Sequence, residues 1–413
     1  MITDNNKKLA QWAMDYALKN GCQAAKLVLY SNSNASFELR DAKMDRLQQA
    51  SESGLSISLY VDGRYGSYST NRLDKKELET FIKNGIESTR YLAVDEARVL
   101  PDASRYYKGG KPDLQLSDRR IISVGTSYGD GESSSYRLTS NGFEGESKST
   151  WFSLSADVAL RGEGEARPSS YWYESALFYD KLVKSGVGTK ALERVLRKLG
   201  QKKVASGKYT MVVDPMNASN LLSPVLSALY GSALQQKNSF LLDKLNVKVG
   251  TGLLNLMDEP HLIGASGARY FDSEGVATER RSIFEEGVLK TYFIDTYNSK
   301  KMGVEPTVNS PSLLVLKPGN KDLNGLVADV QKGILVTGFN GGNCNSSSGD
   351  FSYGIEGFLI ENGKLTQPVS EMNVTGNMIT LWASLSAVGN DPRMSSSWRI
   401  PSLVFEGVDF SGL

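Results

Sequence analysis

Apolar residues near the start of the chain recur every three or four positions, which is the spacing of an amphipathic helix. The recurring residues are Leu9, Trp12, Ala13, Tyr16 and Ala17. Gly21 stands where such a helix is expected to end. A second helix is predicted over residues 75–91, where Leu78, Phe81 and Ile82 fall on one face.

Strand-like runs lie between these two helices. Residues 25–31, 35–41 and 55–70 are rich in β-branched, aromatic and alternating apolar positions, so each run predicts a strand. The pair Asp62-Gly63 inside the last run predicts a tight hairpin turn. The first hundred residues therefore predict a helix–sheet–helix unit.

The pattern then loses its period over residues 100–118, where Pro, Gly and charged residues predict a linker. Strand-like residues return at 149–165, and residues 161–170 predict a polar loop. A helix follows, with its apolar positions at Leu192, Val195, Leu196 and Leu199 and its end at Gly200.

The last two hundred residues are predicted to be mostly strands. A strand over 208–215 precedes a helix over 217–236, and hairpin signals follow at Gly287 and at Asn362-Gly363. The fold class is therefore α+β: a helix–sheet–helix domain at 1–110, a middle region at 111–205, and a mostly β, barrel-like domain at 206–413.

Composition narrows the classes of function. The 413 residues include 47 Lys plus Arg against 46 Asp plus Glu, and this balance argues against binding nucleic acid or an anionic membrane. The sequence has neither a signal-peptide pattern at its start nor an apolar run of membrane-spanning length, which predicts a cytoplasmic protein. Two cysteines, Cys22 and Cys344, fit a reducing compartment and exclude a cysteine-rich zinc site.

His261 is the only histidine of the chain. An imidazole could act as a general base near neutral pH, but no nucleophile motif accompanies this one. A structural, hydrogen-bonded histidine is the favoured interpretation, and a catalytic dyad stays open.

The stretch from Gly338 to Gly354 concentrates Gly, Asn and Ser around Cys344. Backbone N–H groups in such a loop could bind an anion or a peptide, while the same residues also suit a long connection between strands. The peptide-binding candidates are Asn340, Gly341, Gly342, Asn343 and Ser346. Cys344 has no basic neighbour in sequence, which predicts an ordinary thiol.

Carboxylates gather at Asp272, Glu274 and Glu279, beside Arg280 and Arg281. Oxygen ligands in this number could hold a hard cation or form an acid–base pair. The adjacent arginines favour another interpretation, in which the carboxylates form ion pairs on an exposed strand face.

The same region carries a family resemblance. The runs "FDSEGVATERRSIFEEGVLKTYFIDTYNSKKMG", "GFLIENGKLTQPVSEMNVTGN" and "AVGNDPR" resemble the C-terminal half of the TldD/PmbA family, long labelled modulators of DNA gyrase. The order and spacing of the family persist from Lys208 to the C-terminus, and the N-terminal helix–sheet unit also fits, so the resemblance covers nearly the whole chain.

The resemblance implies a zinc metalloprotease family with two related kinds of subunit. One kind carries a His-Glu-x-x-x-His helix and a cysteine ligand near its C-terminus, and the other, PmbA/TldE-type, lacks the site. Aligned without gaps from the run 237–243, the motif falls on Ser223, Pro224 and Ala228. The cysteine region corresponds to residues 393–401, which contain no thiol. The resemblance therefore predicts that this chain has no catalytic residue and no metal ligand.

By resemblance, we expect a non-catalytic subunit that binds unfolded peptide and pairs with a zinc-bearing TldD-type partner or with itself. No cofactor is expected in this chain, and zinc is expected only on the partner. Two alternatives stay open. The chain could itself be a metal-dependent peptidase with an atypical site, or it could regulate DNA gyrase without being an enzyme.

Overall fold

The first sheet of the molecule is a curved antiparallel layer of six long strands. The computed structural model describes residues 2–40, 43–106, 125–160 and 168–413. Strand order across the sheet is β3-β2-β1-β4-β5-β6. The strands are β1 (Ala24–Arg40), β2 (Lys43–Val61), β3 (Arg64–Thr70), β4 (Thr126–Thr139), β5 (Glu144–Ala159) and β6 (Ser169–Ala176). The sheet thus joins strands from both sides of residue 110, and the domain division predicted there stays a prediction.

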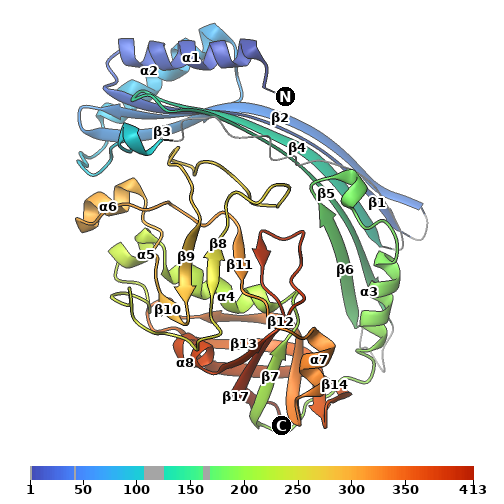
Figure 1. The fold of residues 1–413 in the computed structure, drawn as a ribbon. Coiled ribbons are helices and arrows are strands. Elements are labelled where there is room, and N and C mark those ends of the chain that lie inside the picture. Colours follow the sequence, from blue (N-terminus) through green and yellow to red (C-terminus); the bar gives the residue numbers. More distant parts are fainter. Residues whose placement is uncertain (1, 41–42, 107–124, 161–167) are drawn as a thin grey trace.

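Helices cover one face of this sheet. They are α1 (Asp4–Lys19), α2 (Lys75–Arg90) and α3 (Val187–Leu196), with 3₁₀ turns at Ala103–Arg105 and Tyr179–Lys181. Helices α1 and α2 pack on Leu27, Leu29 and Ile57, while α3 packs on Phe152 and Leu154. Figure 1 shows the sheet bending over the C-terminal part of the chain, with α1 and α2 on its far side.

The predictions for these elements were mostly right. Helices α1 and α2 confirm the two predicted helices, and the two-residue turn at Asp62-Gly63 has the positive φ values, 51° and 71°, of a tight hairpin. The predicted break between residues 31 and 35 was wrong, because Ser31 to Asn34 pair with β2 on one side and β4 on the other. The predicted linker and polar loop lie largely outside the described residues.

The C-terminal part is built around a closed five-stranded barrel. Its order is β14-β13-β12-β7-β17, with β14 pairing to β17 to close the ring and β15 extending from β17. The strands are β7 (Gly207–Val213), β12 (Lys332–Cys344), β13 (Asp350–Glu361), β14 (Lys364–Asn377), β15 (Leu385–Val388) and β17 (Leu403–Ser411). The predicted α+β class with a barrel-like C-terminal domain is confirmed.

A smaller sheet and five short helices complete this part. The sheet has the order β10-β9-β8-β11-β16, made of β8 (Leu256–Asp258), β9 (Arg281–Glu285), β10 (Val288–Leu289), β11 (Leu314–Leu316) and β16 (Trp398–Arg399). The helices are α4 (Ala218–Ala228), α5 (Gly231–Gln235), α6 (Thr296–Met302), α7 (Leu323–Ala328) and α8 (Met378–Ala383). The hairpins predicted at Gly287 and at Asn362-Gly363 are both confirmed.

One predicted helix is divided in two. Residues 217–236 form α4 and α5. The two helices are separated where the backbone of Phe293 inserts: its carbonyl accepts from the amide of Gly231, and its amide donates to the carbonyl of Leu229. The main apolar core lies between α4, the barrel and the smaller sheet. Among the described residues, no helix is long and apolar enough to cross a membrane.

Candidate functional site

Helix α4 carries the three positions where the resemblance places a zinc motif. The helix packs Leu221, Leu222, Val225 and Leu226 into the main core. Ser223 is exposed, Pro224 is half-buried and the methyl group of Ala228 is buried. Zinc in proteins is bound by Cys, His, Asp or Glu. A hydroxyl, a pyrrolidine ring and a methyl group therefore do not fit a zinc ion.

The segment 393–401, where the resemblance places a cysteine ligand, contacts the first sheet. The Arg393 guanidinium donates to the carbonyl of Tyr173 on β6 over 2.6 Å and lies 5.0 Å from the centre of the Trp172 ring. The segment then forms strand β16 beside β11. Within the described part of the chain, no group of three or more His, Cys, Asp or Glu side chains could hold a metal ion.

A polar pocket of about 420 Å³ begins where α4 ends. Its walls come from the turn after α4, from the start of α6 and from two loops. The lining residues are Tyr230, Gly231, Ser232, Ser273, Phe293, Asp295, Asn309 and Ser310. Pockets of this size hold small ligands or a few residues of a peptide. The pocket therefore places a binding volume directly beside the helix that lacks the metal ligands.

The pocket lies where the first sheet touches the C-terminal part. The backbone carbonyl of Ser273 accepts from Lys26 on β1 (3.4 Å) and from Arg137 on β4 (3.3 Å). Arg269 holds the opposite loop, because it donates to the carbonyl and hydroxyl of Ser310 over 2.7 and 3.0 Å. The side chains of Lys26, Arg137 and Arg269 thus hold the two pocket loops in place.

The carboxylates predicted to form ion pairs on an exposed face behave differently from one another. Asp272 is buried and accepts from the amides of Glu274, Val276 and Asn309 over 2.8 to 3.0 Å. Asp272 therefore fixes a turn and a pocket loop, and for this residue the predicted exposed ion pair was wrong.

Glu274 is held in the same region, where its carboxylate accepts from the amide and hydroxyl of Thr296 over 2.9 and 3.0 Å. Burial raises the pKa of Glu274 above its usual value. The ion-pair prediction is confirmed for Glu279, which lies 3.2 Å from Arg281, whereas Arg280 pairs with Glu259 at 2.8 Å.

His261 has a structural environment. Its Nε2 lies 3.2 Å from the hydroxyl of Thr278, and its ring packs on Tyr270 with centroids 5.4 Å apart. The hydroxyl of Thr278 in turn donates to the carbonyl of Arg269. These contacts agree with the favoured interpretation of a hydrogen-bonded structural histidine.

The glycine- and asparagine-rich stretch forms the end of β12 and the turn into β13. Asn340, Gly341, Gly342 and Asn343 are exposed, and the positive φ values of Gly341 (75°) and Gly342 (101°) mark a bulge in the strand. The hydroxyl of Ser346 donates to the side chain of Asn238 over 2.7 Å. None of these residues lines the 420 Å³ pocket, and their role in binding peptide stays a prediction.

Cys344 follows the same bulge and is half-buried. Two effects raise the pKa of its thiol above the usual value: burial is the larger, and the negative charge of nearby Asp350 is the smaller. A raised pKa leaves the thiol protonated at neutral pH, so it is the ordinary thiol that the sequence predicts.

The face of the first sheet opposite its helices carries hydroxyl and amide groups where a core would carry apolar ones. We call its central part the inner face. It consists of Gln48, Ala50, Glu52 and Gly54 on β2, Tyr30, Asn32, Asn34 and Ser36 on β1, Gly129, Gly131, Ser133 and Ser135 on β4, and Ser147, Ser149, Trp151 and Ser153 on β5. Lys26 and Arg137 lie on the same face, and because both reach Ser273 this face is turned toward the C-terminal part.

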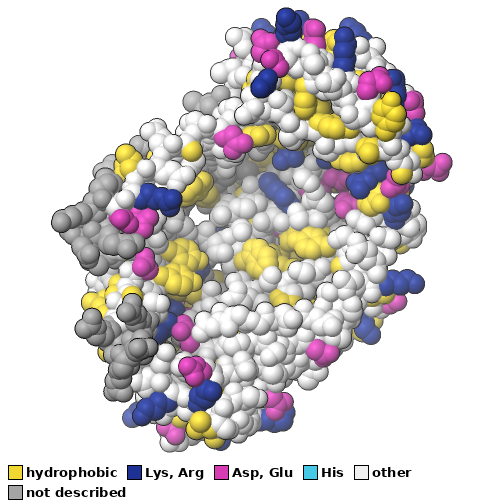
Figure 2. Space-filling view, turned by 180° about the vertical axis from the view of Figure 1, so that it is seen from behind, with side chains coloured by type: hydrophobic (Ala, Val, Ile, Leu, Met, Phe, Trp, Pro, Cys, Tyr) yellow, Lys and Arg dark blue, Asp and Glu magenta, His cyan; other side chains and the backbone are white. Residues whose placement is uncertain are grey.

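Sequence reasoning missed both the inner face and the pocket. Alternating serines in "SYGDGESSSYRLT" and "ESKSTWFSLSA" are a signal for the first, because a period of two places them on one side of a strand. No local signal marks the pocket, since its walls come from four separate segments. Figure 2 shows, from behind, the hollow between the arched sheet and the lower body of the molecule.

Comparison with known proteins identifies the family. Three domains described as PmbA/TldA metallopeptidase match this chain: the first domain over residues 25–89, the central domain over 87–199 and the C-terminal domain over 206–412. The chain belongs to the PmbA/TldD family.

Relatives within the PmbA/TldD family match over nearly full length. A metalloprotease PmbA homolog of Haemophilus influenzae is 26% identical, over 98% of this chain and 96% of that protein. A metalloprotease PmbA of Escherichia coli O157:H7 is 24% identical, over 98% and 97%.

Solved structures extend the comparison. A candidate modulator of DNA gyrase from Bacteroides thetaiotaomicron is 75% identical over the whole of both chains, with a TM-score of 0.97. TldE from Thermococcus kodakarensis shares the fold at 19% identity, with a TM-score of 0.86 over 98% of this chain and all of that one.

Proposed function

We propose that this chain is a non-catalytic subunit of a TldD/TldE-type metalloprotease complex. In this proposal a TldD-type partner holds the zinc ion and cleaves peptides, while this chain binds unfolded substrate and completes the assembly. We further propose that the complex works in the cytoplasm and that the chain can pair with itself when the partner is absent.

The observation that carries the proposal is the chemistry of α4. Ser223, Pro224 and Ala228 supply neither a zinc ligand nor a carboxylate that could activate water. The helix still packs into the core through its apolar side. We expect this combination, a helix that packs into the core but carries no metal ligand, in a subunit that has a structural role and no catalytic one.

The pocket and the inner face support substrate binding. Both lie between the first sheet and the C-terminal part, and both present hydroxyl, amide and aromatic groups. The exposed bulge with Asn340, Gly341, Gly342, Asn343 and Ser346 remains a second proposed contact for peptide. TldD-named relatives of this chain exist, as a partner of that type requires.

Co-expression with a TldD-type subunit tests the proposal. We expect the two chains to purify together with one zinc ion per pair, and we expect the pair to cleave an unfolded peptide until a chelator removes the metal. A matched pair of variants shows which chain holds the zinc ion. We expect replacement of the partner's motif histidines to abolish zinc binding and cleavage, and Ser223→Ala in this chain to leave both unchanged. Zinc bound by this chain alone would contradict the proposal.

The rival peptidase function makes a different prediction. If Asp272, Glu274 or His261 carried out hydrolysis, the purified chain would cleave an unfolded peptide without a partner. Replacing Asp272 with Asn, or His261 with Ala, would then abolish cleavage while a thermal melt reports that the chain is folded. The gyrase alternative is tested by adding the chain to a DNA-supercoiling reaction, where we expect no effect.

A further inference from the structure

The first sheet is attached to the C-terminal part at its two ends. At one end Lys26 and Arg137 donate to the carbonyl of Ser273. At the other, Arg393 donates to the carbonyl of Tyr173, and Lys198, just beyond α3, lies 2.5 Å from Glu356 of β13. The inner face lies between these attachments. Because the sheet is attached at both ends, an extended polypeptide can pass beneath it from one side to the other. A folded domain would need a wider opening to pass in this way.

The side-chain hydrogen bonds described for the inner face run between neighbouring strands. Ser133 donates to Asn32 over 3.0 Å, and the hydroxyls of Ser135 and Ser147 are 2.7 Å apart. Hydroxyl and amide groups both donate and accept, so each keeps capacity for a further partner. Such groups can meet the N–H and C=O groups of a peptide backbone in any register.

The inner face is nearly free of charge. Its only carboxylate, within the sixteen positions that define it, is Glu52, which accepts from the hydroxyl of Tyr30 over 3.2 Å. Serine, asparagine and glycine occupy most of the other positions. A surface with little charge and little apolar area discriminates weakly among side chains, which suits a ligand recognised through its backbone.

Trp151 is the large exposed aromatic residue of this surface. It is 44% exposed, and its indole covers two glycines of β4. A Cβ on Gly131 would lie 2.5 Å from the indole Nε1, and one on Gly129 would lie 2.9 Å from the ring carbon Cη2. The absence of both Cβ atoms lets the ring lie close against the backbone of the sheet while much of the side chain stays exposed. A planar ring held in this way can stack on side chains and peptide groups of a passing chain.

We propose that the inner face is the surface along which an extended, unfolded polypeptide passes, held mainly through its backbone and anchored on Trp151. The proposal rests on the peptide-binding role proposed above and gives it a location. The path leads toward the 420 Å³ pocket at the end of α4, because Arg137 lies on the strand that carries Ser133 and Ser135 and touches the pocket residue Ser273.

Fluorescence anisotropy tests the proposal on the full chain, alone and with its TldD-type partner. The probe is a fluorescein-labelled 20-residue peptide that repeats Gly-Ser-Leu-Asn. We expect Trp151→Ala to weaken binding about 3- to 10-fold, the equivalent of about 0.6–1.4 kcal/mol. The matched control is Phe37→Ala, an aromatic residue of similar exposure (40%) on the opposite face, which we expect to leave binding unchanged.

A charged pair of variants makes the location sharper. The double variant Ser133→Asp, Ser153→Asp places two carboxylates on the inner face, and we expect it to favour a lysine-containing version of the probe over an aspartate-containing one at least 5-fold. Ser51→Asp, Ser53→Asp on the opposite face of β2 is the control and should create no preference.

The outcomes separate this inference from the proposed function. Equal effects of inner-face and control variants, or no binding of the probe by either the unchanged chain or the unchanged pair, would overturn the inference. If the two chains fail to purify together while Trp151→Ala still weakens binding, the inference stands and the proposed assembly fails. If the pair assembles and cleaves but Trp151→Ala and the charged variants have no effect, only the inference fails.

Discussion

The arched sheet and the barrel are built from similar strands but hold together in different ways. In the barrel, β14 pairs with β17 to close the ring, and the strands share the main apolar core with α4. In the arch, the described helices cover one face, the opposite face carries serine and asparagine, and β3 and β6 are the outermost strands in the described order of the sheet. Burial holds the barrel, whereas backbone pairing and attachments at its two ends hold the middle of the arch.

This difference separates stability from function within one chain. A core of closely packed side chains tolerates few changes, so α4 keeps its apolar face even where its outer positions offer no chemistry. A polar face inside a hollow contributes little to folding and is free to be selected for what it contacts. The same chain therefore carries a closely packed scaffold in its barrel and a polar surface in its arch.

The largest expected effect comes from removing an aromatic ring from the barrel. Phe405 is fully buried and meets Trp382 edge to face, with centroids 5.5 Å apart. We expect Phe405→Ala to lower the free energy of unfolding by about 3–5 kcal/mol, because it leaves a cavity in a packed core. Phe37→Ala on the outer side of the arch should cost less than about 1 kcal/mol. Urea unfolding of both variants checks the contrast, and equal losses would contradict it.

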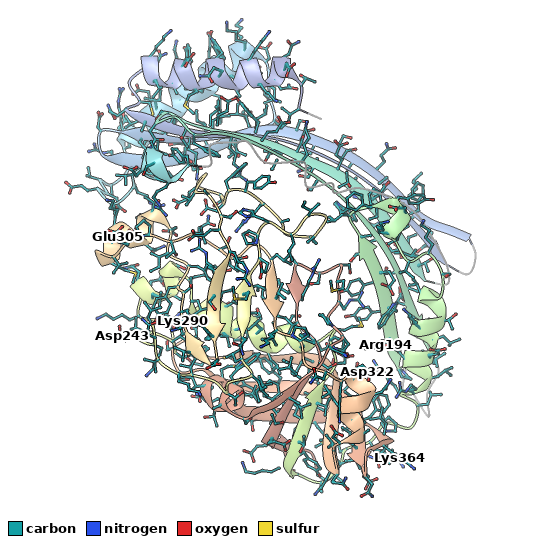
Figure 3. All side chains as sticks on the ribbon, in the orientation of Figure 1. Arg194, Asp243, Lys290, Glu305, Asp322 and Lys364 are labelled. Carbon is teal, nitrogen blue, oxygen red and sulfur yellow. The ribbon has the colours of Figure 1, made fainter. Side chains whose placement is uncertain are left out.

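The next effect concerns the attachment between α3 and the C-terminal part. Arg194, labelled in Figure 3, projects from α3. Its guanidinium lies 3.4 Å from the carboxylate of Asp214, whose side chain is only 3% exposed. We expect Arg194→Met to lower the free energy of unfolding by about 1–3 kcal/mol, because the carboxylate keeps hydrogen bonds from Asn217 but loses its ion pair.

An exposed ion pair of the barrel provides the control for that variant. Lys208 lies 2.9 Å from Asp409, and both side chains are more than half exposed. Lys208→Met should change the free energy of unfolding by less than about 1 kcal/mol. Similar urea midpoints for the two methionine variants would show that the α3 attachment contributes no more than a surface pair.

Local sequence was enough to predict several elements of the fold. The turns at Asp62-Gly63 and Asn362-Gly363 were predictable because a two-residue hairpin needs two residues that accept positive φ. Helix α1 was predictable because its apolar period is unbroken. The proposal that this chain has no zinc site could also be reached by counting, since one histidine cannot supply the two that the motif needs.

Tertiary pairing decided what local sequence did not. Ser31 to Asn34 looked like a break because polar residues occupy both faces there, yet pairing with β2 and β4 carries the strand through. The environment of Asp272 depends on Asn309, 37 residues away, and the pocket depends on four separate segments. Contacts of this range leave no mark in a local pattern.

A smaller effect is expected inside α4 itself, where the barrel's core meets the position of the predicted motif. Pro224 stands in the interior of the helix, where it has no N–H to give to the carbonyl one turn before it. We expect Pro224→Ala to raise the free energy of unfolding by about 1 kcal/mol, less than the usual cost of an interior proline because the unfolded chain also becomes more flexible. Ser223→Ala, at the exposed neighbouring position, is the control and should change it by less than about 0.5 kcal/mol. A loss of stability in Pro224→Ala, measured by urea unfolding, would show that the core has adapted to the ring.

The smallest effect is a pH dependence at the seam between arch and C-terminal part. Burial raises the pKa of Glu274 in the folded chain. Ionising this carboxyl group therefore costs more free energy in the folded state than in the unfolded state. Stability from this group is therefore present at low pH and is lost as the pH rises through the raised pKa. We expect the Tm of the unchanged chain, minus that of Glu274→Gln, to grow as the pH falls from 8 toward the usual glutamate range. Glu305→Gln, at an exposed position on the loop after α6 (Figure 3), is the control variant measured over the same pH range. A difference that shrinks on acidification would mean that the hydrogen bonds from Thr296 outweigh burial, and that the carboxylate at this seam is stabilised in its charged form.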